Sequence, residues 1–339
     1  MEGTRLRLGT EGRLERLYLE WPARLVEVFR EASRASPGRV GGLVVGCGMG
    51  GSAYSVEAAA TLLESRGVPV VVVRDYEPPG FVGPSTLVVA VSFSGETAET
   101  LHCAVRSRSR GARLAVVAGE SSRLERLALE WGAPLYRVPR VGAARTSLAT
   151  LVGGLLGLLD PGLEGVVETI AGALDPAAAA EAAERVVEKL LAWRGERRII
   201  VAACGRLGSV ARRWRSELAE YAGLDVQGEV YPEAGHNSVS TWESGCMSRR
   251  ALILVKHSTD PLCARIEETL IERHCDGNTV IVDVSRQARV HPLAGILQAS
   301  MVAGLAGVKL AEATGRDPLD TPEIKRFRRM VWSVLGDRL

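Results

Sequence analysis

The stretch Val91-Ser92-Phe93-Ser94-Gly95-Glu96-Thr97-Ala98-Glu99-Thr100 decides how the first part of this chain folds. The apolar run at residues 86–91 predicts a buried parallel strand, and residues 98–110 have the spacing of an amphipathic helix. Backbone N–H groups at a helix N-terminus are unpaired, and the helix dipole favours negative charge there. The loop adds three hydroxyl donors and a flexible glycine, namely Ser92, Ser94, Thr97 and Gly95. The stretch therefore predicts a strand, a loop and a helix that together can bind an anion.

The kind of anion is narrowed by what the loop lacks. It carries no cation, and no Gly-Lys-Ser/Thr follows it, which disfavours a P-loop and favours a small phosphate ester held by neutral donors. A Ser/Thr helix cap with a turn glycine needs no ligand at all. The loop by itself leaves the phosphate site and the ordinary cap open as alternatives.

Composition places the chain among ordinary globular proteins. Its 339 residues are 46% hydrophobic and 24% charged, with a net charge of +2, which suits about two domains and indicates neither a nucleic-acid nor a membrane partner. The longest apolar stretch, residues 148–159, is too short to span a bilayer of about 30 Å. Residues 1–5 contain no apolar signal region, so we expect no secretory signal and a cytoplasmic location.

The six cysteines show no CxxC and no paired metal-ligand spacing: Cys47, Cys103, Cys204, Cys246, Cys263 and Cys275. We expect small buried apolar residues in a reducing cytosol, and no metal site. In a thermophile, Cys204 and Cys263 could still form a bridge.

Strand and helix patterns alternate along the first half of the chain. After a helix at residues 11–35 with a kink near Pro22, five strand patterns alternate with helices, at residues 41–46, 68–73, 86–91, 113–117 and 135–138. This alternation predicts an α/β fold with a doubly wound, flavodoxin-like parallel sheet and ligand loops at the strand C-termini.

The pattern then restarts, which predicts an internal repeat. Residues 198–209 echo the first strand and its glycine loop, and residues 251–259 take the place of the hydroxyl loop but lack its Ser-x-Ser-Gly-x-Thr pattern. We therefore expect two related domains, an N-terminal one at residues 1–160 with the phosphate loops and a C-terminal one at residues 161–339. Such pseudo-symmetry usually places a site between the halves.

The first glycine loop also permits a dinucleotide interpretation. Gly46-Cys47-Gly48-Met49-Gly50-Gly51 comes close to GxGxxG, and Asp75 follows the second strand, where a Rossmann unit holds the ribose. The second hydroxyl loop disfavours this alternative, because a dinucleotide fold does not need it and a sugar phosphate bracketed by two loops does.

Candidate acid–base residues occur in the second half. The helix at residues 210–223 carries Glu217 and Glu220, three positions apart, and the loop at residues 232–238 carries His236. Each alone is usually a solvated charge or a turn residue. Together with a phosphate loop, a general-base carboxylate and an imidazole suit aldose–ketose isomerisation, which needs ring opening and proton transfer between adjacent carbons.

Three motifs carry a family resemblance: Gly50-Gly51-Ser52, the residue 92–100 stretch, and Pro232-Glu233-Ala234-Gly235-His236-Asn237. They resemble the sugar isomerase (SIS) domain superfamily, and their order over residues 40–335 resembles its bifunctional phosphoglucose/phosphomannose isomerase family. The resemblance implies phosphate binding by Gly50, Gly51, Ser52, Ser92, Ser94 and Thr97. The family's Arg-Trp-Lys-x-x-Leu-x-Glu-Asn-Ala stretch matches residues 213–222, which implies that Glu220 is the base and that Glu217 falls on a variable position.

The resemblance implies further roles and shows some departures. His236 falls on the ring-opening histidine, Arg145 on the arginine that steadies the enediolate, and Thr321 on a threonine that leaves room for either C2 epimer. Arg328 stands where the family has a lysine, and it is not equivalent to lysine in geometry. Other positions that differ from the family's pattern are Ala144, Tyr221 and Ser238.

The resemblance implies that the protein interconverts glucose 6-phosphate with fructose 6-phosphate through a cis-enediol, with mannose 6-phosphate as a second candidate substrate. It needs no metal or redox cofactor, and it forms a homodimer in which the partner subunit supplies the histidine. The alternatives are a non-catalytic sugar-phosphate-binding regulator, an isomerase for another phosphosugar, and an NAD(P)-binding dehydrogenase.

Overall fold

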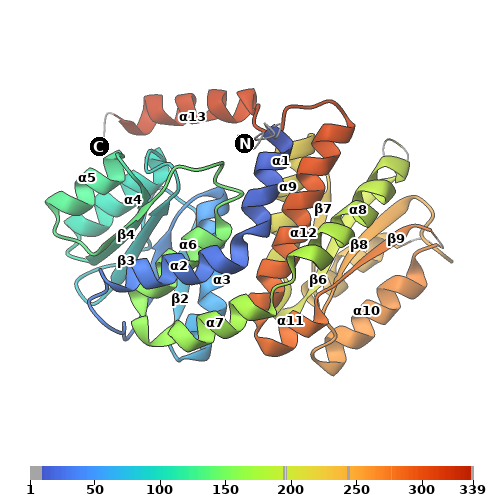
Figure 1. The fold of residues 1–339 in the computed structure, drawn as a ribbon, viewed down its shortest axis with the longest axis horizontal. Coiled ribbons are helices and arrows are strands. Elements are labelled where there is room, and N and C mark those ends of the chain that lie inside the picture. The colour runs from blue at the N-terminus through green and yellow to red at the C-terminus, as the bar shows by residue number, and fades with distance from the viewer. Residues whose placement is uncertain (1–9, 194, 196, 243–244, 276, 337–339) are drawn as a thin grey trace, which may run out of the picture.

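The computed structural model describes residues 10–193, 195, 197–242, 245–275 and 277–336, and it contains two parallel sheets with helices packed around each (Figure 1). Residues 1–5, for which the sequence predicts no secretory signal, lie outside the described residues.

The first sheet has the strand order β2-β1-β3-β4-β5, with every pair parallel. Its strands are β1 (Val44–Cys47), β2 (Val70–Val73), β3 (Leu87–Ser92), β4 (Arg113–Gly119) and β5 (Leu135–Val138). The central strand β3 is buried at every position, because helices cover both faces of the sheet. The order confirms the predicted flavodoxin-like, doubly wound sheet.

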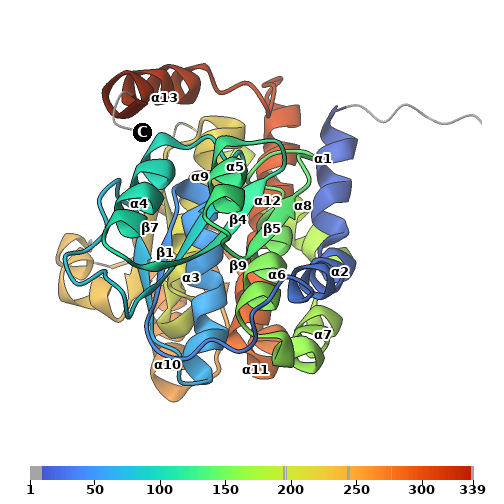
Figure 2. The same ribbon diagram turned by 90° about the vertical axis from the view of Figure 1, so that its left-hand side faces the viewer.

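Two groups of helices cover the two faces of this sheet. Figure 2, which faces the first half, shows α4 and α5 on one side and α2 and α6 on the other. The helices are α2 (Trp21–Ser33), α3 (Gly50–Ser65), α4 (Ala98–Ser109), α5 (Arg123–Glu130) and α6 (Leu148–Leu159). The predicted kinked helix is two helices: α1 (Thr10–Leu19) ends before Glu20, and Pro22 lies in the first turn of α2.

The second sheet has the order β7-β6-β8-β9, which repeats the order of the first four strands of the first sheet. Its strands are β6 (Arg198–Cys204), β7 (Gln227–Tyr231), β8 (Arg250–Lys256) and β9 (Thr279–Asp283). The surrounding helices are α7 (Glu164–Ala173), α8 (Pro176–Trp193), α9 (Ser209–Ala222), α10 (Pro261–Arg273), α11 (Ser285–Val290) and α12 (Pro292–Ala313), and the short 3₁₀ turns are η1 (Pro161–Leu163), η2 (Gly205–Leu207), η3 (Glu233–His236) and η4 (Ser238–Thr241). The repeated order supports the interpretation of the chain as two copies of one α/β unit.

The first and the last described helix each pack against the opposite half of the chain. Helix α1 packs against α12 of the second half, and the last helix, α13 (Pro322–Leu335), packs against α4 of the first half (Figure 1). Helices α3 and α9 also touch, and one hydrophobic core contains residues of both halves. The predicted boundary near residue 160 stays a prediction, because each half is completed by a helix from the other end of the chain.

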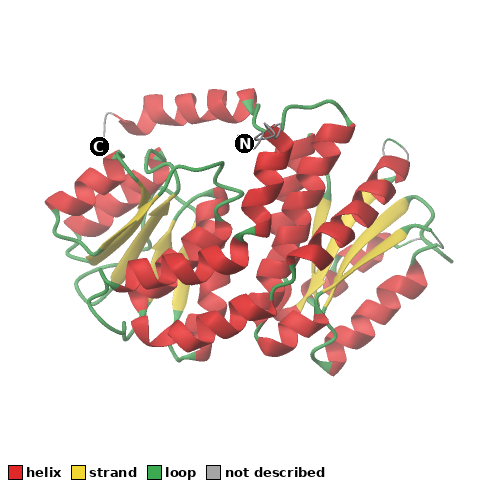
Figure 3. Ribbon diagram, viewed as in Figure 1, coloured by secondary structure: helices red, strands yellow, loops and turns green. Residues whose placement is uncertain are grey.

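Helix α12 is the core of this shared interface. By length and composition it is the one helix of the described residues that could cross a membrane, but 94% of its apolar window is buried inside the protein. Its apolar character is explained by burial between α1, α8 and α9. The colouring by secondary structure in Figure 3 shows it among helices that separate the two sheets.

The prediction of six reduced cysteines is wrong. The structure contains three disulfides, Cys47–Cys103, Cys204–Cys263 and Cys246–Cys275, and leaves no free cysteine. The paired residues are 56, 59 and 29 positions apart, so no local spacing reveals them and only the order of the strands brings them together. The Cys204–Cys263 bridge is the one that the sequence left open.

Candidate active site

The two predicted phosphate loops lie side by side at the C-terminal ends of β1 and β3. In a sheet of this order the connections reverse direction between these two strands, and ligands bind in the crevice that this reversal opens. Gly48 lets the loops touch, because a Cβ there would lie 3.0 Å from the Ala53 nitrogen and 3.1 Å from the Val91 oxygen. The fold therefore places the glycine loop and the hydroxyl loop around one crevice.

Four hydroxyl side chains meet at this crevice. Ser52 accepts a hydrogen bond from the backbone N–H of Phe93 at 3.2 Å, which ties the first loop to the second. Ser92 lies 3.1 Å from the Thr97 hydroxyl, and Ser94 lies 3.5 Å from both of those hydroxyls. Gly50 and Gly95 have φ of +51° and +64°, a conformation that other residues rarely adopt. The predicted phosphate residues are thus brought together, and their role stays a prediction.

The hydroxyl loop does not act as an ordinary helix cap. Thr97 occupies the N-cap position of α4, yet in the described structure its side chain accepts no hydrogen bond from the helix, and the same holds for Met49 at α3. Ser122, by contrast, caps α5 in the usual way by accepting from the Glu125 N–H at 3.2 Å. The side chains at α3 and α4 therefore leave helix N–H groups without a capping partner, as an anion site requires.

In the corresponding loops of the second half, a side chain of the protein caps the helix that follows β8. There Asp260 caps α10 by accepting from the Cys263 N–H at 2.9 Å, and the Cys204–Cys263 disulfide joins the end of β6 to α10. The His257 imidazole lies 3.1 Å from the Cys204 carbonyl oxygen. The Cys204, His257 and Cys263 ligand atoms lie within 4.8 Å of one another, but the two sulfurs are bonded to each other, so neither is a thiolate that could hold a metal.

Glu220 and Arg145 form an ion pair between the two halves of the chain. Arg145 also donates to the Pro318 carbonyl oxygen at 2.8 Å, and its guanidinium lies 4.3 Å from the centre of the Tyr221 ring. Burial disfavours the charged form, but nearby Tyr221, Glu220 and Glu217 outweigh it and raise the pKa of Arg145. The Glu220 side chain is 33% exposed, so this carboxylate remains accessible to a ligand.

Glu217 has a different environment from Glu220, which their three-residue spacing did not reveal. It is 1% exposed, forms an ion pair with Arg213, and accepts a hydrogen bond from the Tyr18 hydroxyl at 3.2 Å. Burial raises the pKa of its carboxyl, while Arg213 and Arg145 lower it. The Tyr221 hydroxyl, at a position where the chain departs from the family's pattern, lies 2.9 Å from that of Tyr18. No sequence signal pointed to this buried cluster.

Within one chain, His236 is not joined to the other candidate residues. It is exposed on η3, which packs against β7 and η4, and in the described structure no hydrogen bond or ion pair links it to Glu220 or to the phosphate loops. Among the described residues, the predicted base and the predicted ring-opening histidine are therefore not in hydrogen-bond or ion-pair contact.

The C-terminal helix α13 lies over the hydroxyl loop. Its Trp332 donates to the Glu96 carbonyl oxygen at 3.0 Å, and the Arg123 guanidinium lies 4.6 Å from the centre of the Trp332 ring. Arg328 is exposed on this helix, and Thr321 is its half-buried N-cap residue. Arg328 thus lies on the helix that contacts the hydroxyl loop through Trp332.

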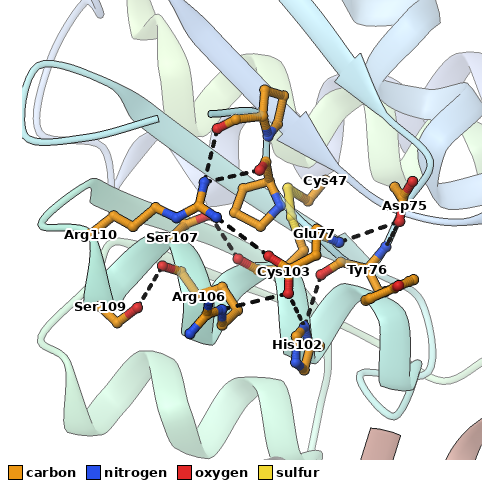
Figure 4. A network of polar contacts seen from close by, with 12 residues as sticks. Cys47, Asp75, Tyr76, Glu77, His102, Cys103, Arg106, Ser107, Ser109 and Arg110 are labelled. Atoms are coloured by element: carbon orange, nitrogen blue, oxygen red, sulfur yellow. Dashed lines mark hydrogen bonds and ion pairs between the residues drawn. A yellow bond between two sulfur atoms is a disulfide. The ribbon is translucent and has the colours of Figure 1, made fainter. Parts of the chain in front are cut away.

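A network of polar contacts connects the segment after β2 to α4, and Asp75 belongs to that segment (Figure 4). Glu77 lies 3.7 Å from His102, 3.6 Å from Arg106 and 3.4 Å from Arg110, all on or next to α4. Asp75 accepts from the N–H of Tyr76 at 2.6 Å and so caps its own turn. This local bond accounts for Asp75 without a ribose, and the network holds the helix whose N-terminus is part of the predicted anion site.

Known proteins resemble the chain over most of its length. The family model described as "SIS domain" matches residues 43–131, and that described as "Bacterial phospho-glucose isomerase C-terminal SIS domain" matches residues 180–331. A bifunctional phosphoglucose/phosphomannose isomerase of Pyrobaculum aerophilum is 32% identical over 83% of this chain and 85% of its own length. One of the same name from Aeropyrum pernix is 29% identical over 95% of this chain and 99% of its own length.

Solved structures show the same fold. A hypothetical protein from Thermus thermophilus matches with a TM-score of 0.72 and 20% identity, over 98% of this chain and 92% of its own. The two family models match the two halves of the chain in the order in which the structure places them, and the relatives match the chain over most of its length. The chain belongs to the bifunctional phosphoglucose/phosphomannose isomerase family of SIS-domain proteins.

Proposed function

We propose that the protein is an aldose–ketose isomerase that interconverts glucose 6-phosphate, and also mannose 6-phosphate, with fructose 6-phosphate. Its family membership supports this activity. The observation that carries the proposal is that four hydroxyl residues lie at the N-termini of two helices whose first turns have no side-chain cap. The same half of the chain carries Arg145, which pairs with the accessible carboxylate of Glu220. An anion anchor, a base and a cation are the groups that this reaction needs.

In the proposed mechanism, the phosphate is held by the loops of Ser52 and of Ser92 to Thr97. The Glu220 carboxylate takes the proton from C2 of the open-chain aldose and returns it to C1, while the proton of the C2 hydroxyl passes to the oxygen of C1, so that the reaction proceeds through a cis-enediol. Arg145 then stabilises the negative charge that develops on the oxygens of C1 and C2. As the proton moves, the Arg145 guanidinium exchanges its ion pair with the Glu220 carboxylate for one with the negatively charged oxygens of the substrate.

Ring opening needs a proton donor and acceptor, which we assign to His236 from a second copy of the chain in a homodimer. This part of the proposal is supported by the exposure of His236, which leaves its imidazole accessible to a second copy of the chain. The outer face of α13 offers apolar surface for a second copy, with Phe327, Met330 and Val334 exposed by 61%, 50% and 55%.

We also place the enzyme in cytoplasmic carbohydrate metabolism, where the interconversion of these hexose phosphates is a step of both glycolysis and gluconeogenesis. Three disulfides are compatible with the cytoplasm only in some organisms, since intracellular proteins of hyperthermophiles are rich in them.

The proposal is tested by coupled assays with glucose 6-phosphate and mannose 6-phosphate, together with thermal shifts induced by fructose 6-phosphate and by NAD(P). We expect turnover of both aldoses and a shift with the ketose. A shift without turnover would favour the non-catalytic sugar-phosphate sensor, and a shift with the nucleotide alone would favour the dehydrogenase.

A further inference from the structure

Arg213 reaches from α9 of the second half into the loops of the first half. It is 4% exposed, and its Nη2 donates to the backbone carbonyl oxygen of Arg145 at 2.7 Å. Its Nη1 lies 3.4 Å from the place where a Cβ on Gly51 would stand, so the guanidinium also packs beneath the glycine loop. One side chain thus touches both the turn that carries Arg145 and the loop predicted to hold phosphate.

Arg213 is held in this position by groups that do not face the crevice. It forms an i,i+4 ion pair with Glu217 on its own helix, and its guanidinium lies 5.4 Å from the centre of the Tyr54 ring. Glu217 accepts in turn from the Tyr18 hydroxyl at 3.2 Å. The Tyr18 ring occupies a place on α12 that only a glycine leaves open, because a Cβ on Gly304 would overlap it. The arrangement is built from four helices and is fully enclosed.

We propose that Arg213, fixed by Glu217, is a positioning residue that sets Arg145 and the Gly51 loop at defined places relative to Glu220. This inference rests on the proposed isomerase function. When the Glu220 carboxylate turns to the substrate, Arg145 gives up its ion pair. Three contacts then remain to keep the Arg145 guanidinium in place: the bond from Arg213 to the Arg145 carbonyl, the bond from Arg145 to Pro318, and the packing of Arg145 on Tyr221.

The guanidinium suits this task because it is planar and branched: its Nη2 makes both the ion pair with Glu217 and the bond to the Arg145 carbonyl, while its Nη1 lies beneath the Gly51 loop. A lysine ammonium ends one bond short of the Nη2 position, so it does not reach both partners with the same geometry, and it has no second nitrogen to lie beneath the loop. Arg213→Lys therefore conserves the charge and removes the positioning. Because a displacement of about 1 Å can cost roughly a hundredfold in rate, we expect kcat to fall about tenfold to a hundredfold.

A readout of binding separates positioning from a general loss of structure. 6-Phosphogluconate carries a carboxylate at C1, near where the enediolate carries its charge, whereas glucitol 6-phosphate has the same phosphate and no charge there. We expect Arg213→Lys to weaken binding of 6-phosphogluconate by about tenfold more than binding of glucitol 6-phosphate, since a displaced Arg145 affects only the charged end.

Arg212→Lys is the matched control. Arg212 is the neighbouring residue on α9 and also forms an ion pair across the halves, with Glu57 on α3, but it is exposed and touches neither Arg145 nor Gly51. We expect this variant to keep the wild-type kcat and the wild-type ratio of the two dissociation constants.

The outcomes are distinct. An unchanged ratio in a folded Arg213→Lys variant, with an active wild type, would overturn the positioning role and leave the isomerase function standing. A wild type that turns over neither hexose phosphate would overturn the proposed function instead. If Arg213→Lys does not fold, Tyr18→Phe is measured in the same way, because it keeps every charge and removes the hydroxyl that contacts both Glu217 and Tyr221. An unchanged ratio there would also contradict the inference.

Discussion

Replacing Gly307 by alanine tests the packing beneath the candidate base. Gly307 lies on α12 where that helix crosses α9, and a Cβ at this position would stand 2.7 Å from Cδ2 of Tyr221, 3.2 Å from its Cβ and 3.3 Å from its Cγ. Ordinary van der Waals contact begins near 3.4 Å, so the two helices must separate by about 3.4 − 2.7 = 0.7 Å. Two of these contact atoms, Cβ and Cγ, are the atoms of the side chain nearest the Tyr221 backbone, and the side chain is completely buried. Rotation of the ring therefore cannot relieve the contact.

The expected cost follows from two opposing effects. Overpacking of a buried site costs about 1–3 kcal/mol, and the gain in helix propensity from glycine to alanine returns about 0.5–1 kcal/mol. We therefore expect Gly307→Ala to lower the free energy of unfolding by about 1–2 kcal/mol. Because the Tyr221 ring lies under Arg145, a displacement near 0.7 Å should also lower kcat, by about tenfold.

The assay is urea-induced unfolding at 25 °C, followed by circular dichroism, alongside steady-state isomerisation. Gly172→Ala is the matched control, because Gly172 lies in helix α7 with no atom within 4 Å of its Cβ position. It should gain stability and keep its activity. If Gly307→Ala were as stable and as active as the wild type, the close contact of α12 with Tyr221 would be refuted. In a Tyr221→Ala background the cost of Gly307→Ala should shrink, since the clashing ring is gone.

Three further predictions concern the base, a disulfide and a buried histidine. Glu220→Gln should lower kcat at least tenfold, as the loss of a general base does, and a residual rate above a tenth in the steady-state assay would contradict its role. Replacing both Cys204 and Cys263 by alanine should lower the free energy of unfolding by roughly 4 kcal/mol, because the bridge closes a loop of 59 residues; identical urea midpoints for variant and wild type under non-reducing conditions would contradict this. Burial lowers the pKa of His274 below the ordinary 6.5, so the unfolded chain takes up its proton first, and the free energy of unfolding should decrease as the pH falls below 6.5. His274→Asn should show a weaker decrease between pH 7.5 and pH 5, and an equal one would refute the assignment.

Local patterns in the sequence were sufficient for the fold class. The period of apolar residues identified the strands around residues 86–91 and 198–204, and glycine and hydroxyl residues after them located the loops, because these signals depend on neighbours in the chain. The strand orders confirm the doubly wound sheets and the repeat. The motif of residues 92–97 likewise located its loop, since a helix N-terminus and its hydroxyls are contiguous.

The sequence by itself thus determined the two α/β units, the hydroxyl loop and the candidate base, while only the tertiary structure decided how they are joined. The disulfides, the pairing of Arg145 with Glu220 and the burial of Glu217 beside Tyr18 unite residues 29 to 199 positions apart. Glu217 and Glu220 share a helix and a charge, yet Glu217 is buried in an ion pair with Arg213, whereas Glu220 is partly exposed and pairs with Arg145. The physical reason is that burial and partnership depend on how α1, α9 and α12 pack against one another, and a local pattern does not specify that packing.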